Sequence, residues 1–212
     1  MDASPDTPTA DRRERKKAAT RQRIADVATM MFGERGFDAV TVNEIAEAAD
    51  VSKVTVFNHF ARKEDMFFDR MPQARELLAQ TIKTRPKGRT VVWAVRRMVQ
   101  THIKEQHPLL GLRERYSGFW QVVADSRALQ VRARELGDEI EALLAELILA
   151  EGQVDERHAR LTAGWIMTAI RTGLLTAVAR VMADDPIEAI NKDYAAFMKR
   201  SLIAVEFAAK LA

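Results

Sequence analysis

The residues best suited to chemistry in this sequence form one short cluster. Lys53 can donate a hydrogen bond to guanine and Asn58 can pair with adenine, whereas Val54 can contact the methyl group of thymine. Thr55 can also face a base edge, and His59 is better placed for a phosphate. In a helix these residues share the outer side. The chemistry that the cluster suggests is contact with a nucleic acid.

Two short helices joined by a tight turn are needed to position this cluster, and residues 41–60 predict both. Thr41 followed by Glu44 is the capping-box pattern that starts a helix, and Ser52 offers the N-cap of a second one. Apolar residues recur at helical spacing on one face of each helix: Val42, Ile45, Ala46 and Ala49, then Val56, Phe57 and Phe60. On this pattern alone, an ordinary αα-hairpin and a DNA-binding helix-turn-helix both remain open.

The order of polar, apolar and aromatic residues in this stretch resembles the DNA-binding motif of TetR-family transcriptional regulators. The run that carries the resemblance is Thr41-Val-x-x-Ile-Ala-x-Ala-Ala-x-Val-Ser-x-x-Thr-x-Phe-x-His-Phe-x-x-Lys63. It extends back through Ala28, Phe32, Gly36 and Phe37, so that about residues 20–68 are covered.

Three positions depart from the family's pattern. Asp50 stands where the family usually has glycine, and aspartate tolerates the left-handed conformation that the turn requires. Val54 stands where a small residue is common, which changes the surface offered to a base. Phe57 stands where tyrosine is usual, so the phosphate contact of that hydroxyl is absent.

The resemblance implies a regulator, most often a repressor, that binds a palindromic operator in double-stranded DNA as a homodimer and is released by a small hydrophobic effector. Residues implied to face base edges are Lys53, Val54, Thr55 and Asn58. Residues implied to lie at phosphates or beside them are Arg21, Arg23, Thr41, Ser52, Phe57, His59 and Lys63.

The charge of the chain is concentrated near its N-terminus. The net charge is +3, but residues 11–23 hold seven basic and two acidic side chains, a net +5, which leaves −2 for the rest. A basic arm on a near-neutral body suggests contact with a polyanion, and a solvated tail is the alternative. We expect residues 1–19 to form a disordered arm, because residues 1–10 are rich in Pro, Ser, Thr and Asp.

Composition limits the remaining possibilities. The 212 residues, 47% of them apolar, are enough for one or two domains with sizeable cores. The chain has no cysteine, which excludes disulfides and thiolate metal sites, and we expect no cofactor. The N-terminus lacks the apolar run of a signal peptide. We expect no apolar stretch near the ~18 residues of a membrane span, and therefore a cytoplasmic protein with no membrane partner.

The periodicity predicts an all-α protein of about nine helices in two domains. After the arm, residues 20–65 form the DNA-binding domain and residues 66–212 a ligand-binding and dimerisation domain. The expected helices cover about residues 20–35, the two of the motif, 62–83, 90–107, 108–124, 126–151, 155–183 and 187–212. Pro72 lies inside the helix expected over 62–83, where it predicts a kink and a hinge between the domains. Asp185-Pro-Ile-Glu188 predicts a capped start for the last helix.

The last two helices are rich in small residues, which allow close helix approach. On the first these are mixed with larger ones: Gly164, Ala169, Thr172, Gly173, Thr176, Ala177 and Arg180. On the second they are Ala195, Ala196, Phe197, Ser201, Ala204, Val205 and Ala208. Internal packing explains such residues equally well, but the resemblance implies a twofold dimer formed by these two helices from each subunit.

The second domain mixes aromatic and methionine side chains with a few polar ones, which suits a small-molecule pocket. The candidate lining is Trp93, Met98, His102, Tyr116, Phe119, Trp120, Met167 and Arg171. A plain hydrophobic core has the same composition. Arg171 can face a carboxylate ligand, and a position in solvent or at the edge of a dimer is the alternative.

An enzyme is not expected. The histidines are His59, His102, His107 and His158, and no pair has the His-Glu-x-x-His spacing of a zinc hydrolase. Two readings remain beside the ligand-responsive regulator. One is an all-α enzyme acting on a hydrophobic substrate, and the other is a weakly specific architectural protein whose DNA binding depends on salt but not on sequence.

Overall fold

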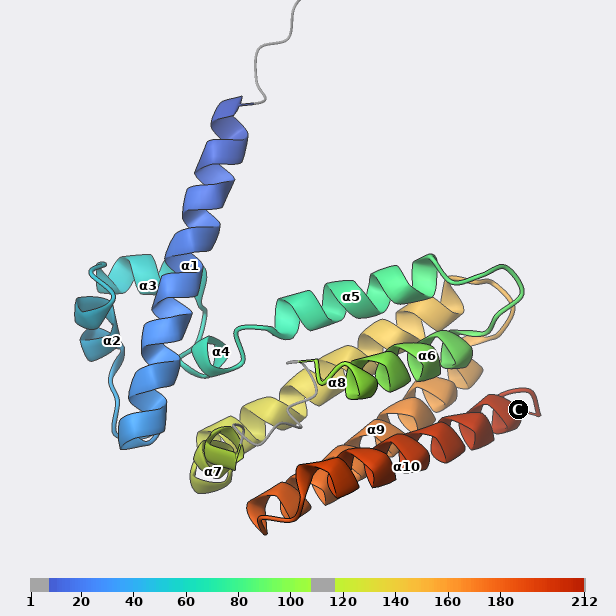
Figure 1. Cartoon of the computed structure of the whole chain (residues 1–212). Coiled ribbons are helices and arrows are strands. Elements are labelled where there is room, and N and C mark those ends of the chain that lie inside the picture. The colour runs from blue at the N-terminus through green and yellow to red at the C-terminus, as the bar shows by residue number, and fades with distance from the viewer. Residues whose placement is uncertain (1–7, 108–116, 212) are drawn as a thin grey trace, which may run out of the picture. The chain divides into compact units, whose positions relative to one another are not determined.

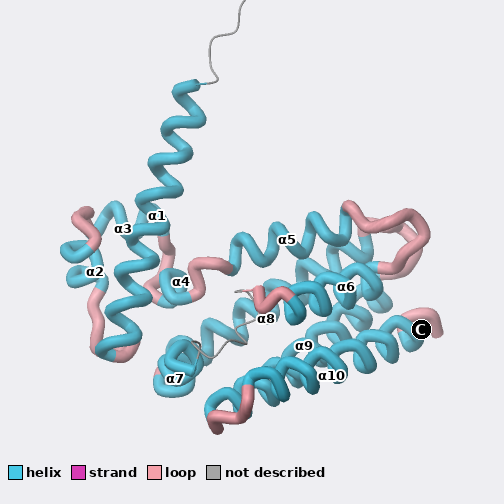
Figure 2. The backbone as a smooth tube through the Cα atoms, viewed as in Figure 1, coloured by secondary structure: helices cyan, strands magenta, loops and turns pink. Residues whose placement is uncertain are grey.

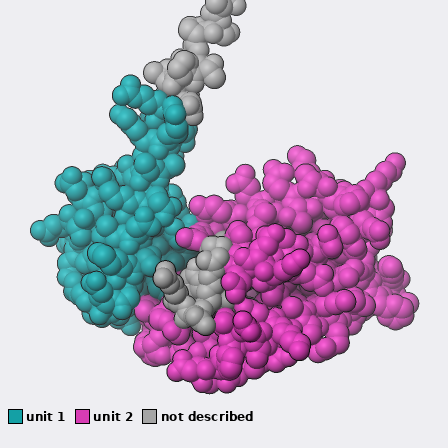
Figure 3. Space-filling model, in the orientation of Figure 1, with its two compact units in different colours: residues 1–69 teal, residues 70–212 magenta. Residues whose placement is uncertain are grey.

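The computed structural model describes residues 8–107 and 117–211, with side chains from Arg12 onward in the first range. Over these residues the chain forms ten helices and no strand (Figure 1, Figure 2), which confirms the all-α fold. The chain divides into two compact units, Met1–Asp69 and Arg70–Ala212 (Figure 3). The boundary lies slightly beyond the one expected after residue 65.

The first unit packs short helices on one long helix. It contains α1 (Pro8–Arg35), α2 (Val42–Ala48), α3 (Lys53–His59) and α4 (Glu64–Phe67). All three short helices contact α1, and Ile24, Phe32 and Phe60 are buried in the core of the unit. Gly36 ends α1 as expected, with a φ of +82° that glycine adopts readily at a helix C-terminus.

The start of α1 corrects one expectation. Residues 8–19, expected to be disordered, belong to the helix. The reason is their composition, because alanine, arginine, lysine and glutamate fill residues 12–19 and have the highest helix propensities. Extending an existing helix also avoids the costly nucleation step, so this segment needs no buried face of its own.

The connection between the units also differs from the expectation. Instead of one kinked helix over residues 62–83, the chain ends α4 at Phe67 and starts α5 (Met71–Lys83) after a turn. Pro72 lies in the first turn of α5, where the missing amide hydrogen has no intrahelical acceptor to lose. Pro72 therefore starts a helix, and the kink expected there was wrong.

The second unit is a bundle built around α9. Besides α5 it contains α6 (Val91–Lys104), α7 (Ser117–Asp125), α8 (Arg127–Leu149), α9 (Glu156–Met182) and α10 (Ile187–Ala208). The helix α9 packs on α8 and α10, and α10 also packs on α6 (Figure 1). Their shared core includes Val95, Leu144, Ile166, Met198 and Leu202.

Helix caps explain most starts in this unit. Thr90, Ser126 and Asp155 each accept a hydrogen bond from the amide three residues on, and they lie where the sequence predicts the starts of these helices. Asp185 was expected to cap the last helix, but its carboxylate accepts a 2.6 Å hydrogen bond from Arg180. Pro186 is the N-cap residue instead and has no side-chain cap bond.

The small residues of α9 serve internal packing at its centre. A Cβ atom on Gly173 would lie 2.8 Å from a ring carbon of Tyr194 and 2.9 Å from the sulfur of Met198, both on α10. Ala177 is also buried. Gly173 therefore allows α9 and α10 of one chain to approach closely, so the expectation that it lies at a dimer contact was wrong.

The helix α9 has the length and apolar composition of a membrane span, contrary to the expectation that no stretch reaches it. The central helix of a folded bundle has the same composition. Ala163 and Ile166 are fully buried in the core of the unit, and Arg180 forms ion pairs with Asp185 and Asp193. We therefore assign α9 to the protein core.

Candidate DNA-binding surface

The start of α2 and the turn between α2 and α3 have the local structure that the sequence predicts. The amide of Glu44 donates to Thr41 Oγ1 at 3.3 Å, and the Glu44 carboxylate accepts from the Thr41 amide at 2.8 Å. The Thr41 hydroxyl donates to the Glu44 carboxylate at 2.7 Å, and this bond, with those from the Thr41 amide and from Arg35 at 2.7 Å, lowers the pKa of Glu44 to about 2. Asp50 has a φ of 50°, so the left-handed turn residue was predicted correctly.

The outward side of α3 is a mixed polar and apolar surface. Val56 and Phe60 are buried against the rest of the unit, and Lys53, Val54 and Asn58 are exposed on the other side. Val54 is 69% exposed. Val54 therefore presents apolar surface beside the polar side chains of Lys53 and Asn58.

Phe57 belongs to the outward side as well. It is 46% exposed, although the sequence placed it on the apolar face with Val56 and Phe60. The reason is helical geometry, because adjacent residues are rotated by about 100° at ~3.6 residues per turn, and Phe57 cannot point where its neighbour Val56 points. The exposed face of α3 therefore carries two large apolar side chains, Val54 and Phe57.

Thr55 and Ser52 form the N-terminal cap of α3. The amide of Thr55 donates to Ser52 Oγ at 3.0 Å, and the two hydroxyl oxygens are 2.8 Å apart. Thr55 is half-buried. Its hydroxyl group already has a partner, so it is less suited to base reading than Lys53 or Asn58.

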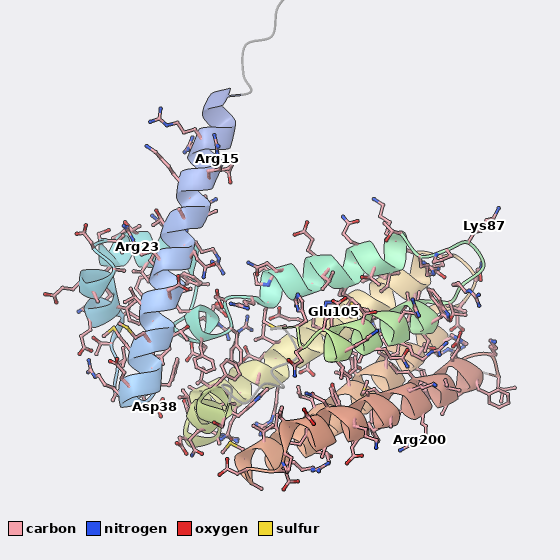
Figure 4. All side chains as sticks on the ribbon, in the orientation of Figure 1. Arg15, Arg23, Asp38, Lys87, Glu105 and Arg200 are labelled. Atoms are coloured by element: carbon pink, nitrogen blue, oxygen red, sulfur yellow. The ribbon has the colours of Figure 1, made fainter. Side chains whose placement is uncertain are left out.

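Arg21 connects α1 to the C-terminal end of α3. Its guanidinium group lies 3.9 Å from the ring centroid of Phe60 and donates to the carbonyl of His59. Burial lowers the pKa of His59, and the charges of Arg21 and Lys17 lower it further, which favours the neutral imidazole. Arg23, two residues along, is exposed and extends from α1 (Figure 4).

Lys63 was expected to contact a DNA phosphate, but its ammonium group is bonded within the first unit instead. Its Nζ donates to the carbonyls of Phe37 and Val40 at 2.7 and 2.6 Å, and it lies 4.1 Å from the ring centroid of Phe37. Burial lowers the pKa of Lys63. This ammonium group satisfies two carbonyls of the loop between α1 and α2, so the lysine stabilises the unit from within.

Replacing Lys63 with methionine is expected to destabilise the first unit by about 2 kcal/mol. A hydrogen bond from a charged donor typically contributes ~1.5–3 kcal/mol, and Lys63 is only half-buried. Hydrogen exchange of α1–α4 measures the loss, with Lys83→Met, an exposed lysine of α5, as the control. If Lys63→Met instead left the hydrogen-exchange protection of α1–α4 unchanged and made DNA binding less dependent on salt, Lys63 would be a phosphate contact.

The candidate ligand residues have different local surroundings. Trp93, Met98 and Met167 pack against the core of the second unit, and Arg89 and Arg97 lie over the ring of Trp93. His102 Nδ1 lies 2.8 Å from the carbonyl of Met98. Phe119 and Trp120 contact each other edge to face, and Tyr116 lies outside the described residues.

One open groove of about 520 Å³ lies along α8 and α9. Arg171 is the candidate residue that lines it, together with Glu141, Arg157, Arg160, Leu161, Gly164, Trp165 and Thr168. The helices α9 and α10 also expose large apolar residues, which are Leu161 of the groove, Leu175, Met182, Ile203 and Phe207. The small residues of the same two helices pointed to close helix approach and not to these larger side chains. Their seven-residue and four-residue spacing was the available signal.

Comparison with known proteins agrees with this fold. Residues 24–69 match the family described as bacterial regulatory proteins, tetR family. The HTH-type transcriptional regulator TcmR of Streptomyces glaucescens is 28% identical over 154 residues, which are 71% of this chain and 62% of that protein. The chain therefore spans slightly less than two thirds of the length of this relative.

Two solved structures share the fold. NalD, the secondary repressor of the MexAB-OprM multidrug efflux pump in Pseudomonas aeruginosa, is 17% identical with a TM-score of 0.55, and the similarity covers 87% of this chain and 97% of NalD. SmeT, in complex with triclosan, is 20% identical with a TM-score of 0.56, covering 88% and 91% of the two chains. The matched segment 24–69, centred on α2 and α3, is therefore similar to the tetR family of bacterial regulatory proteins, and the chain as a whole shares the fold of the two solved structures.

Proposed function

We propose that this protein is a DNA-binding transcriptional regulator that acts in the cytoplasm as a repressor at a palindromic operator, and that it is not an enzyme. The exposed face of α3 carries the proposal. Lys53 and Asn58 supply hydrogen-bond donors and an acceptor there, and Val54 and Phe57 supply apolar surface. This combination suits the major groove, where donors, acceptors and thymine methyl groups are displayed together.

The N-terminus of α3 and the exposed Arg23 support the same proposal. The N-terminus of α3 is exposed at Ser52 and Lys53, and helix N-termini attract phosphate groups. The exposed Arg23 adds a cation suited to the same backbone. These groups fix the register of the helix on the duplex, while the middle of α3 reads the bases.

A homodimer is part of the proposal. A palindrome is read by two copies related by a twofold axis. The exposed apolar residues of α9 and α10 support self-association, because several large apolar side chains exposed on two packed helices favour a protein partner. Leu161, Leu175 and Met182 recur at multiples of seven residues, the spacing of helices that pack along their length.

An effector that binds the second unit completes the proposal. A small hydrophobic molecule would favour a dimer whose two α3 helices are wrongly spaced for the operator. SmeT binds triclosan, and its similarity in fold supports a ligand site in the second unit here. His102, Phe119, Trp120 and Arg171 remain the candidate residues, because they lie outside the packed core cluster.

Lys53→Ala and Asn58→Ala test base reading. Each is expected to weaken operator binding about tenfold, since one good base contact contributes ~1–3 kcal/mol of discrimination, and to affect random duplexes much less. Lys87→Ala, on an exposed lysine of the second unit (Figure 4), removes the same charge elsewhere and is the control. Equal losses on operator and random DNA would favour the architectural alternative.

A further inference from the structure

The part of α1 that precedes Ile24 is a helical extension without a core of its own. Ile24 is fully buried, whereas the side chains of residues 12–19 are all exposed. The family match also begins at residue 24. Neither packing nor the matched segment accounts for the sequence of this extension.

Positive charge distinguishes the extension from the rest of the chain. Residues 12–23 hold seven basic side chains and one acidic one, Glu14, although the net charge of the whole chain is only +3. Arg15 and Arg23 extend sideways from the helix (Figure 4). Cations gathered this closely repel one another, so a bound polyanion would relieve a cost that the free protein carries.

One row of these cations starts beside α3. Arg13, Lys17 and Arg21 are four residues apart, and such residues lie above one another on a helix. Arg21 fixes the row to the end of α3 through the Phe60 ring and the His59 carbonyl. Lys17, one turn earlier, is near enough for its charge to act on His59. The row therefore leads from the end of α3 along the extension.

We propose that Arg13 and Lys17 bind phosphates of the DNA that flanks each half-site, an inference that rests on the proposed function. Arg21 lies eight positions after Arg13, a distance of about 12 Å along the helix at ~1.5 Å per residue. Phosphates of one strand are ~3.4 Å apart along the axis, so the row covers about three to four base pairs. Phosphate contacts position a protein and carry no direct sequence information, so the extension lengthens the bound DNA without changing the preferred sequence.

The neighbouring row provides a matched control. Arg12 and Lys16 are also four residues apart and carry the same charge, but they are rotated by about 100° from Arg13 and Lys17 at ~3.6 residues per turn. Alanine preserves the helix at all four positions, since it has the highest helix propensity. Circular dichroism of the full chain verifies that both double variants keep their helix content.

The test uses a duplex selected from random-sequence DNA by the full chain, with and without about four flanking base pairs on each side. On the flanked duplex, R13A/K17A is expected to weaken binding at least about tenfold and to lower the slope of log K against log salt by ~3.6, or ~0.9 for each of two phosphates at each of the two half-sites. R12A/K16A is expected to change the affinity less than about twofold. On the trimmed duplex, R13A/K17A should bind like the wild type.

Equal losses in the two double variants would overturn the inference, because the charge would then act without a preferred face. A loss that persists on the trimmed duplex would overturn it too, since the row would lie within the half-site. Selection that recovers no shared sequence with the wild type would contradict the proposed function itself, and that outcome is recognisable before any variant is measured.

Discussion

Replacing Leu175 and Phe207 together with glutamate is expected to turn a dimer into a folded monomer that no longer holds its operator. The two side chains are 61% and 66% exposed on α9 and α10, so neither contributes to the core of its own chain. In a dimer their carboxylates would be buried without partners, which costs several kcal/mol by the usual penalties for desolvated charge. Linking two half-site contacts typically raises affinity ~10²–10⁴-fold, so a monomer should bind the operator at least about 100-fold more weakly.

The matched control is Leu149→Glu at the end of α8. Leu149 is also exposed, at 42%, but it lies outside the two helices proposed for the interface. Light scattering should find a dimer for the wild type and the control, and a monomer for the double variant. A monomeric wild type, or a dimer in all three proteins, would contradict the assignment of this surface.

Gly173→Leu is expected to disrupt the packing of α9 against α10 and so to destabilise the second unit. The first added carbon would already lie 2.8–3.0 Å from Tyr194, Met198 and Phe197, and overpacking a core typically costs ~1–3 kcal/mol, with larger side chains costing more. We expect a loss of about 3 kcal/mol or more in the free energy of unfolding. Urea unfolding followed by tryptophan fluorescence measures it.

Gly137 of α8 provides the comparison. A Cβ there meets nothing within 4 Å, so Gly137→Ala should stabilise the protein by up to ~1 kcal/mol through helix propensity. The free energy of unfolding of Gly173→Ala should lie between those of Gly173→Leu and Gly137→Ala. A dimer that dissociates in Gly173→Leu with no change in the stability of the subunit would mean that Gly173 faces a second copy after all.

Features set by neighbouring residues could be predicted from the sequence. The capping box of Thr41 and Glu44, the Ser52 cap and the left-handed turn at Asp50 all depend on residues within one turn of helix. Helix caps and turn residues of this kind can be predicted from residue type and spacing alone. The same local rules correctly placed the starts of α6, α8 and α9.

Features set by contacts distant in sequence could not be predicted. Lys63 finds its carbonyl partners 26 and 23 residues away, and Arg21 reaches His59 across 38 residues. Spacing identifies both side chains as cations but not the groups they meet. For Gly173, a small residue in a helix indicates close approach, yet only the fold shows that α10 of the same chain is the helix that approaches.

The claim that α3 reads a palindromic operator is tested most directly by recovering the fragments of its own genome that the protein binds. Fragments bound by the wild type should share a sequence with twofold symmetry, and K53A/N58A should lose that enrichment while remaining folded. Fragments with no common sequence, recovered equally well by the wild type and by K53A/N58A, would contradict base reading by α3.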